Sequence, residues 1–159
     1  MKLFTALCAG ALLIAGTAAL ADSLPEDTSA GIWKLNLEKS TFGSRQAPRS
    51  EIRKYTVTPK GTRVVITDIN NDGSTTISRT VLTYDGKPHP FTGSPNYDAA
   101  STQRQSKYET TADMYLKRKV VGSLRRVVSE DGKTMTMNMK LNKADGTQEM
   151  TMSVFDKQP

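Results

Sequence analysis

Cysteine and histidine are almost missing from this chain, which has one of each among its 159 residues. Cys8 lies in an N-terminal apolar segment that we expect to be removed, so the mature chain would contain no thiol. That excludes disulfide bonds, thiol catalysis and thiolate metal sites. We predict neither a metal site nor a cofactor.

His89, the single histidine, stands between Pro88 and Pro90, which favours an exposed loop position, with a ligand contact at a rim as the functional alternative. No G-x-S-x-G or H-E-x-x-H motif surrounds it. The carboxylates lie mostly in turns, where Asp suits the backbone, and no pair of them is spaced as a general acid and base. The sequence thus predicts no catalytic residue and a protein that is not an enzyme.

The chain has one long apolar run, Leu3 to Leu20, which follows Lys2 and ends in the A-x-A motif of residues 19–21. This arrangement is typical of a secretory signal peptide, and its Gly and Thr interruptions disfavour a transmembrane anchor. We predict a signal peptide at 1–21, a flexible leader at 22–29 and export to the periplasm or the medium. The net charge of +6 is spread along the chain and favours only loose attraction to anionic surfaces.

Helical periodicity is also lacking, and apolar residues instead alternate with polar ones between turns. Asp-Gly occurs four times, at 72–73, 85–86, 131–132 and 145–146, where it favours tight hairpins. A helical turn over 37–42 is an alternative at one point only. The predicted strands are 31–37, 50–58, 63–69, 74–84, 87–92, 101–109, 111–118, 120–129, 133–142 and 147–156.

Ten short strands in one domain predict an antiparallel up-and-down sheet, which loses its exposed edges when it closes into a barrel. We therefore expect an all-β fold: a single barrel of about 8–10 strands over residues 30–157. The segments 43–49 and 88–95 are rich in loop residues and would arch over one mouth.

The start of the first predicted strand, Gly31-Ile32-Trp33, resembles the G-x-W motif of lipocalins and the related fatty-acid-binding proteins. The stretches "YDGKPHPFTGSP" and "RRVVSEDGKT" are similar to those of secreted bacterial lipocalin-like domains. The resemblance implies a calycin-type barrel in which Trp33 closes one end and a late arginine, Arg125 or Arg126, packs over it. Fatty-acid-binding proteins hold a carboxylate with an Arg-x-Tyr pair on a C-terminal strand, and "EMTMSVFD" lacks that pair.

The stretch "KTMTMNMKLN", residues 133–142, places Met135, Met137 and Met139 on one face of a strand, and Met150 and Met152 repeat the spacing on the next strand. Three hypotheses fit: core filling, a cavity wall that repacks around apolar ligands, and a Cu(I) site of adjacent thioethers. Copper ranks last, because the histidine and cysteine that usually join such methionines are missing.

Arg79 lies in phase with Ile77 and Val81, so it would point into the barrel if that face is the inner one. The opposite face, with Leu82 and Tyr84, is nearly as apolar, so an outward Arg79 is the alternative. Arg125 and Arg126 carry the same ambiguity. The candidate ligand-binding residues are Trp33, Tyr55, Arg79, Tyr108, Met114, Arg126, Met135, Met137, Met139, Met150 and Met152.

Two further motifs have simpler interpretations. Residues 68–73 open like an EF-hand loop, but Arg79 stands where its last glutamate ligand should be, so we predict a hairpin turn. The basic cluster Lys117, Arg118 and Lys119 has one aromatic residue, Tyr115, beside it; this favours a solvated turn over a nucleic-acid or lipid-headgroup contact.

We conclude that the sequence fits best an exported, non-enzymatic protein that holds a small apolar or amphipathic molecule in a barrel cavity. The alternative is a filled barrel whose loops at 43–49 and 88–97 grip or inhibit another envelope protein, marked by an exposed apolar patch around Phe91 and Tyr97. Methionine-based copper binding ranks third.

Overall fold

The computed structural model describes residues 26–143 and 145–159, and these residues form ten β-strands and no helix. The signal peptide predicted at 1–21 lies outside the described residues. In chain order the strands are β1 (Gly31–Thr41), β2 (Ser50–Thr58), β3 (Gly61–Ile69), β4 (Thr75–Leu82), β5 (Pro88–Thr92), β6 (Ala99–Arg104), β7 (Glu109–Leu116), β8 (Lys119–Val128), β9 (Thr134–Asn142) and β10 (Gln148–Lys157).

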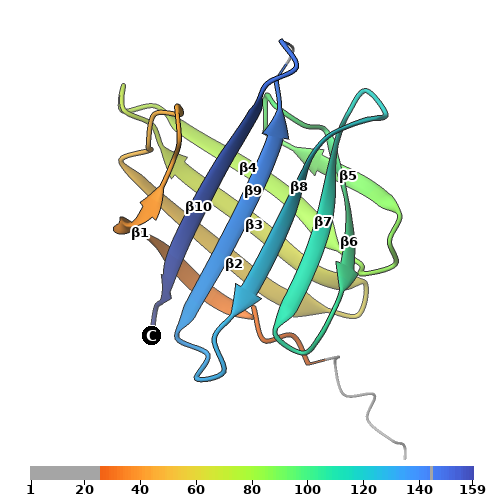
Figure 1. Cartoon of the computed structure of the whole chain (residues 1–159). Coiled ribbons are helices and arrows are strands. Elements are labelled where there is room, and N and C mark those ends of the chain that lie inside the picture. The colour runs from red at the N-terminus through yellow and green to blue at the C-terminus, as the bar shows by residue number, and fades with distance from the viewer. Residues whose placement is uncertain (1–25, 144) are drawn as a thin grey trace, which may run out of the picture.

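Each strand pairs antiparallel with the next one along the chain, and β1 also pairs with β10, so the sheet closes into a barrel. In Figure 1, strands β6 to β10 cross in front of β2, β3 and β4, with the barrel interior between the two layers. Closure leaves no unpaired sheet edge. The predicted all-β, up-and-down barrel is confirmed, and its ten strands reach the upper end of the predicted range.

The closing contact between β1 and β10 contains a bulge. Their register passes from Asn36 opposite Val154 to Thr41 opposite Met152, which leaves extra residues on β1. The Ser40 hydroxyl bridges the gap, because it donates to the Asn36 carbonyl at 2.6 Å and accepts from the Val154 N–H at 2.9 Å. Residues 37–41 are therefore bulged strand, and the alternative of a helical turn there is wrong.

The Asp-Gly turns form as their sequences predict. Gly73, Gly132 and Gly146 all have positive φ, and the carboxylate of the preceding Asp accepts a backbone N–H two residues on. Asp72 accepts from the Ser74 N–H at 2.8 Å. Residues 68–73 thus belong to the β3–β4 hairpin, in line with the prediction for that stretch.

The two ends of the barrel differ. At what we call the closed end, the turns 59–60, 83–87, 105–108 and 129–133 meet residues 26–30. At the open end lie the connections 42–49, 70–74, 93–98 and 117–118, together with residues 143 and 145–147. The fully buried side chains Trp33, Phe155 and Met135 belong to strand segments near the closed end, so the packed core fills that half.

The segment before β1 packs into the closed end. Asp27 and Ser29 are buried, and the Trp33 Nε1–H donates to the Ser29 carbonyl at 2.8 Å. The described part of the predicted leader, residues 26–29, thus contributes to the barrel floor.

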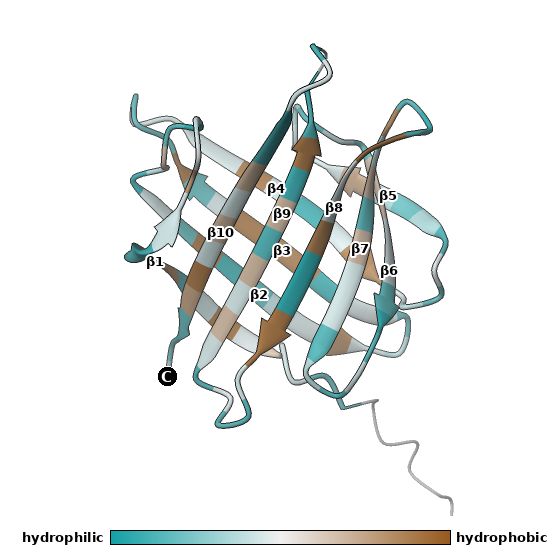
Figure 2. Cartoon of the chain, viewed as in Figure 1, coloured by the Kyte–Doolittle hydropathy of each residue, from teal (hydrophilic) through white to brown (hydrophobic). Residues whose placement is uncertain are grey.

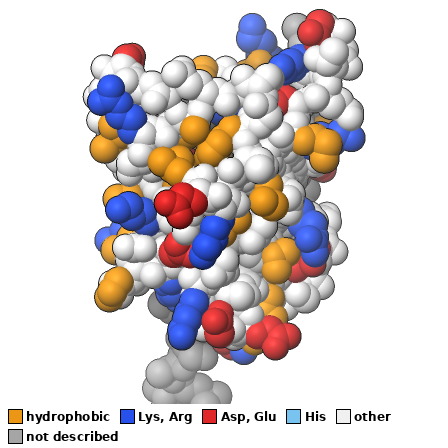
Figure 3. Space-filling view, turned by 60° about the vertical axis from the view of Figure 1, so that its left-hand side comes forward, with side chains coloured by type: hydrophobic (Ala, Val, Ile, Leu, Met, Phe, Trp, Pro, Cys, Tyr) orange, Lys and Arg blue, Asp and Glu red, His pale blue; other side chains and the backbone are white. Residues whose placement is uncertain are grey.

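The outside of the barrel is mixed in character. Figure 3 shows hydrophobic, basic and acidic side chains interspersed over one face of its surface. The alternation of hydrophilic and hydrophobic residues along the strands in Figure 2 is expected, because successive side chains point to opposite faces of the sheet. Within residues 26–143 and 145–159, no helix is long and apolar enough to cross a membrane.

Candidate ligand-binding site

The closed half of the barrel interior leaves little free space. Below its middle lies a cavity of about 50 Å³, with Tyr55, Leu82, Met114 and Arg126 among its lining residues. A space of that size admits a water molecule or two and no larger ligand. The side chains there form a floor, and any bound molecule has to occupy the other half.

The open half contains a cavity of about 410 Å³ that is reached between the connections 42–48 and 93–97. Ile66, Leu124, Met137 and Met139 supply apolar side chains to its wall. The polar part of the wall consists of three charged side chains, Glu51, Arg53 and Asp68, and of the hydroxyl groups of Thr76, Ser78, Tyr97, Thr151 and Ser153. Cavities that hold small molecules begin at about 300 Å³, so this one is large enough for a small ligand.

Three charged side chains cluster on the β2–β3 wall of this cavity. Glu51 and Asp68 are opposite one another in the strand register, and Arg53 lies on the same face two residues after Glu51. The Arg53 guanidinium donates to the Glu51 carboxylate, and its Cζ lies 5.0 Å from the centre of the Phe155 ring. Arg53 thus contacts both the charged Glu51 of the cavity wall and the buried Phe155 of the packed core.

The two carboxylates are electrostatically costly neighbours. Burial raises the pKa of Asp68 and the adjacent Glu51 raises it further, against the effect of Arg53 and Arg45, so that it reaches about 6. Burial alone would lower the pKa of Arg53, but the Glu51 carboxylate and the nearby tyrosines hold it above its usual value. Arg53 therefore stays charged, while the raised pKa of Asp68 places its change of protonation state at about pH 6.

A second polar network lies at the closed end of the barrel, beneath the packed side chains. Arg126 is 5% exposed; it donates to the Tyr84 hydroxyl and to Thr110 Oγ1, both at 3.1 Å, and its Cζ lies 5.1 Å from the Tyr55 ring centre. The Tyr84 hydroxyl in turn donates to the Asp27 carboxylate. A buried arginine is thus connected through one phenol to a buried carboxylate.

Asp27 is the anionic end of this network. Burial raises the pKa of Asp27, but hydrogen bonds from Ser29, Thr62 and Tyr84 outweigh it and lower that pKa to about 2. Arg104 adds a positive charge 3.6 Å away. Because every group in the network has a partner, its role is to seal and stiffen the closed end.

Six of the predicted site residues have side chains on the inner face and are buried. They are Trp33, Tyr55, Met114, Arg126, Met135 and Met137. Arg126 is thereby distinguished from Arg125, which is exposed and binds Glu109 through two contacts of 2.7 Å. Met137 and the half-buried Met139 line the open cavity, whereas Trp33 and Met135 belong to the packed core.

Four predicted site residues lie elsewhere. Arg79 is exposed because Ser78, Thr80 and Leu82 take the inner positions of β4; the outward alternative is therefore correct, and the expected place of Arg79 in the cavity is wrong. Tyr108 sits in the β6–β7 turn at the closed end, where Lys107 Nζ lies 5.7 Å from its ring centre.

Met150 and Met152 occupy the outer face of β10, because Thr151, Ser153 and Phe155 are its inner residues. They therefore do not join Met135, Met137 and Met139 in a common column. The two-strand thioether cluster that a Cu(I) site would need does not form, so the structural premise of the copper hypothesis is wrong.

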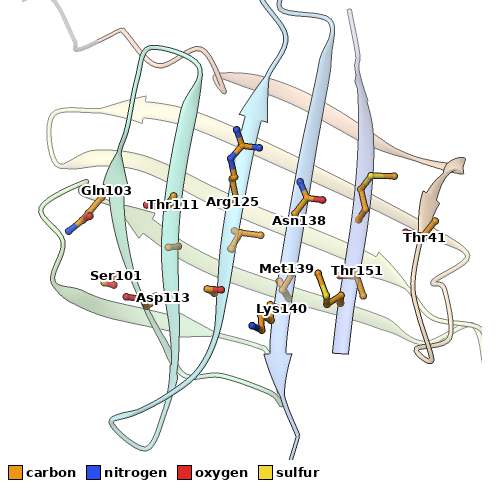
Figure 4. Close-up of a pocket in the computed structure, with 15 residues that line it drawn as sticks. Thr41, Ser101, Gln103, Thr111, Asp113, Arg125, Asn138, Met139, Lys140 and Thr151 are labelled. Atoms are coloured by element: carbon orange, nitrogen blue, oxygen red, sulfur yellow. The ribbon is translucent and has the colours of Figure 1, made fainter. Parts of the chain in front are cut away.

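The outward methionines border a shallow groove of about 480 Å³ on the outside of β6–β10 (Figure 4). The groove runs across the strands between two rows of outward side chains, and its floor includes the backbone of Ala112, Leu124, Met139 and Thr151. One row consists of Gln103, Thr111, Arg125, Asn138 and Met152. The other row consists of Ser101, Asp113, Ser123, Lys140 and Met150. This groove is separate from the interior.

The apolar patch expected for an interaction module is not exposed as such. Phe91 is buried, and Tyr97 packs edge-on against it with ring centres 4.7 Å apart. Tyr97 thus borders the open cavity, and Phe91 borders the small cavity in the floor. That removes the sequence-based reason to prefer a protein-binding surface there.

The packing over Trp33 also differs from the lipocalin expectation. Lys157 packs over the Trp33 ring, with its Nζ 5.2 Å from the ring centre. Arg126 covers Tyr55 instead. A lysine from the end of β10 thus closes the barrel over its tryptophan.

No protein family model and no curated protein matches this chain. Among solved structures, the barrel is similar to zebrafish ileal bile acid-binding protein complexed with cholic acid, with a TM-score of 0.52 and 8% sequence identity. The match covers 83% of this chain and 100% of that chain. At this identity the likeness shows the fold alone, and it agrees with the calycin-like barrel expected from the sequence.

Proposed function

We propose that this protein is an exported, non-enzymatic binding protein that holds one small amphipathic molecule in the open half of its barrel. The observation that carries the proposal is the cavity of about 410 Å³, which is open at one end and closed below by packed and hydrogen-bonded side chains. The similarity to a barrel crystallised with cholic acid supports the same kind of ligand.

The lining indicates how the ligand would lie. Its apolar part would contact Leu124, Met137 and Met139. The flexible thioether side chains of the two methionines adapt to different shapes. Its polar part would meet the charged cluster of Glu51, Arg53 and Asp68, which offers both donors and acceptors. A ligand that is apolar throughout would take Asp68 and the Arg53–Glu51 pair out of water and offer them no hydrogen bond, so an amphipathic molecule fits better.

The proposal is tested by titrating the purified protein with the amphipathic dye 1-anilinonaphthalene-8-sulfonate and following the fluorescence of the bound dye. The Ser153→Phe variant places a phenyl group in the cavity, because Ser153 is an inner residue opposite Met137. The matched control is Ser123→Phe, which adds the same group to an exposed position on the outer face of β8.

We expect saturable dye binding by the wild type and by Ser123→Phe, and binding at least about tenfold weaker in Ser153→Phe. Circular dichroism establishes that both variants retain the barrel. Equal binding by a folded Ser153→Phe variant, or loss of binding in Ser123→Phe alone, contradicts the interior site.

A further inference from the structure

The hairpin between β7 and β8 has an unusual turn. Leu116 pairs with Lys119, so the loop consists of Lys117 and Arg118 only, and these residues have φ values of 49° and 68°. Positive φ at both central residues is the requirement of a type I′ turn, which Asn-Gly and Gly-Gly satisfy most easily. Long side chains at both positions are therefore strained.

Elsewhere in the described residues, glycine occupies every position of positive φ but one. Eight glycines take the left-handed conformation in the described residues, and Tyr84 is the one other non-glycine residue there that does so. The tips of the β3–β4, β8–β9 and β9–β10 hairpins each use a glycine. The β7–β8 tip, by contrast, has two basic residues at positive-φ positions that glycine would occupy without strain.

The surrounding structure holds the strained turn in place. Asp98, in the β5–β6 connection, accepts a hydrogen bond from the Lys117 N–H at 2.9 Å through its carboxylate, and its own N–H donates to the Tyr115 carbonyl at 2.8 Å. The turn is therefore anchored to the rim of the mouth. Strain that is maintained by specific contacts is characteristic of functional sites.

The side chains at this tip are available to a partner. Lys117, Arg118 and Lys119 are exposed, and the adjacent Val120 is 53% exposed. Figure 1 shows the hairpin extending beyond the rim at the open end. The tip thus combines three cations with an apolar side chain.

The charge of the open end agrees with this local pattern. Its connecting segments contain five basic residues against three aspartates, whereas the closed-end segments, residues 26–30 included, contain four basic against five acidic residues. The open end is therefore the more positive of the two, and it is also where the cavity opens.

We propose that the β7–β8 hairpin docks the open end of the barrel onto an anionic lipid bilayer, so that the cavity faces the membrane surface. Anionic leaflets attract clusters of Lys and Arg, and exposed apolar side chains beside such a cluster enter the headgroup region. A nucleic acid would call for several stacking aromatic side chains among the charges, whereas Tyr115, opposite the exposed Val120, is the one aromatic residue beside this cluster, so a bilayer is favoured. The proposal does not depend on what the cavity binds.

The test measures cosedimentation of residues 22–159, the chain without the predicted signal peptide, with vesicles of about 70% phosphatidylcholine and about 30% phosphatidylglycerol, at low and at physiological salt. The test variant is Lys117→Asn with Arg118→Gly, which removes two charges and supplies residues suited to the turn. The control is Lys60→Gln with Lys87→Gln, which removes two charges from closed-end turns.

We expect the test variant to partition roughly 10- to 30-fold more weakly at low salt, because each basic side chain contributes about a factor of five. We also expect its Tm to rise by roughly 3–8 °C, since the strain is relieved. The control should keep wild-type partitioning, and vesicles of phosphatidylcholine alone should bind none of the proteins.

A higher Tm with unchanged partitioning would overturn the proposal, because the turn would then be strained without serving the membrane. If the control variant also bound the vesicles equally weakly, the effect would be due to net charge alone, and the proposal would be overturned as well. A lower Tm refutes the strain on which the proposal rests. Tight binding to single-stranded DNA that the test variant loses, without vesicle binding by the wild type, would assign the hairpin to nucleic acid instead.

Discussion

Replacement of Asp68 by Asn tests the electrostatics of the cavity. In the folded protein, burial and the neighbouring Glu51 carboxylate raise the pKa of Asp68 from 3.8 to about 6. That interval corresponds to about 3 kcal/mol, and solvent screening at the open mouth reduces it to roughly 1–2 kcal/mol. Asn is close to the protonated carboxyl in shape, so the substitution removes this penalty with little change in packing.

The direction of the pH dependence follows from proton binding. Between 3.8 and about 6 the folded state binds more protons at Asp68 than the unfolded state does. The contribution of this group to stability is therefore greatest at low pH and falls as the pH rises through that window. Asp68→Asn should stabilise the protein by roughly 1–2 kcal/mol at about pH 7.5 and leave it nearly unchanged at about pH 3.

The assay is urea unfolding of wild type and variant at both pH values, followed by fluorescence of the single tryptophan, Trp33. Asp113→Asn is the matched control, because Asp113 is exposed on the outer wall and its replacement should change stability by less than about 0.5 kcal/mol. A variant that is no more stable than wild type at about pH 7.5, or that gains equally at both pH values, refutes the reasoning.

Three further substitutions probe the closed end and the strand faces. Asp27→Asn should destabilise the protein by about 2 kcal/mol at neutral pH. Because the folded-state pKa of Asp27 is lowered to about 2, this stabilisation is present above pH 3.8 and is lost as the pH falls through about 2. Equal stability of variant and wild type in urea unfolding at about pH 7 would contradict the network. Met135→Ala should lower the free energy of unfolding by roughly 2–5 kcal/mol, because Met135 is fully buried. Met150 is 70% exposed, so Met150→Ala should lower it by less than about 0.5 kcal/mol. Comparable losses of stability in thermal unfolding would contradict the assigned faces of β9 and β10.

The alternation of apolar residues and the Asp-Gly turns were sufficient to predict the fold. Nearly every strand begins and ends within a few residues of its predicted bounds, because tight turns mark the ends of strands in an antiparallel meander. The bulge in β1 was not predictable, since it depends on the Ser40 hydroxyl reaching both Asn36 and Val154 across the barrel seam.

The inner faces of two strands could not be assigned from the sequence. In β10 the outward Met150, Met152 and Val154 are more apolar than the inward Thr151 and Ser153, and only Phe155 anchors the true inner face. Such two-sided strands do not specify their register locally; the packing of Phe155 opposite Met135 does so. The same reason explains the outward Arg79.

The charged cluster of the cavity was missed altogether. Glu51 and Arg53 alternate with exposed residues on β2 and are in phase with the buried Tyr55, which is a signal for an inward face. Charged residues on a predicted strand suggest the solvent side, and Asp68 looked like part of a turn. Only the closed barrel shows that all three border one cavity.

The most direct test of the proposed function uses methionines on both faces of the wall as reporters. In protein labelled with ¹³C at the methionine methyl groups, we predict that titration with 1-anilinonaphthalene-8-sulfonate shifts the NMR signals of Met137 and Met139 saturably. The signals of Met150 and Met152, on the outer groove, should stay in place. Unmoved Met137 and Met139 signals at dye saturation, or shifts confined to Met150 and Met152, would contradict a ligand site inside the barrel.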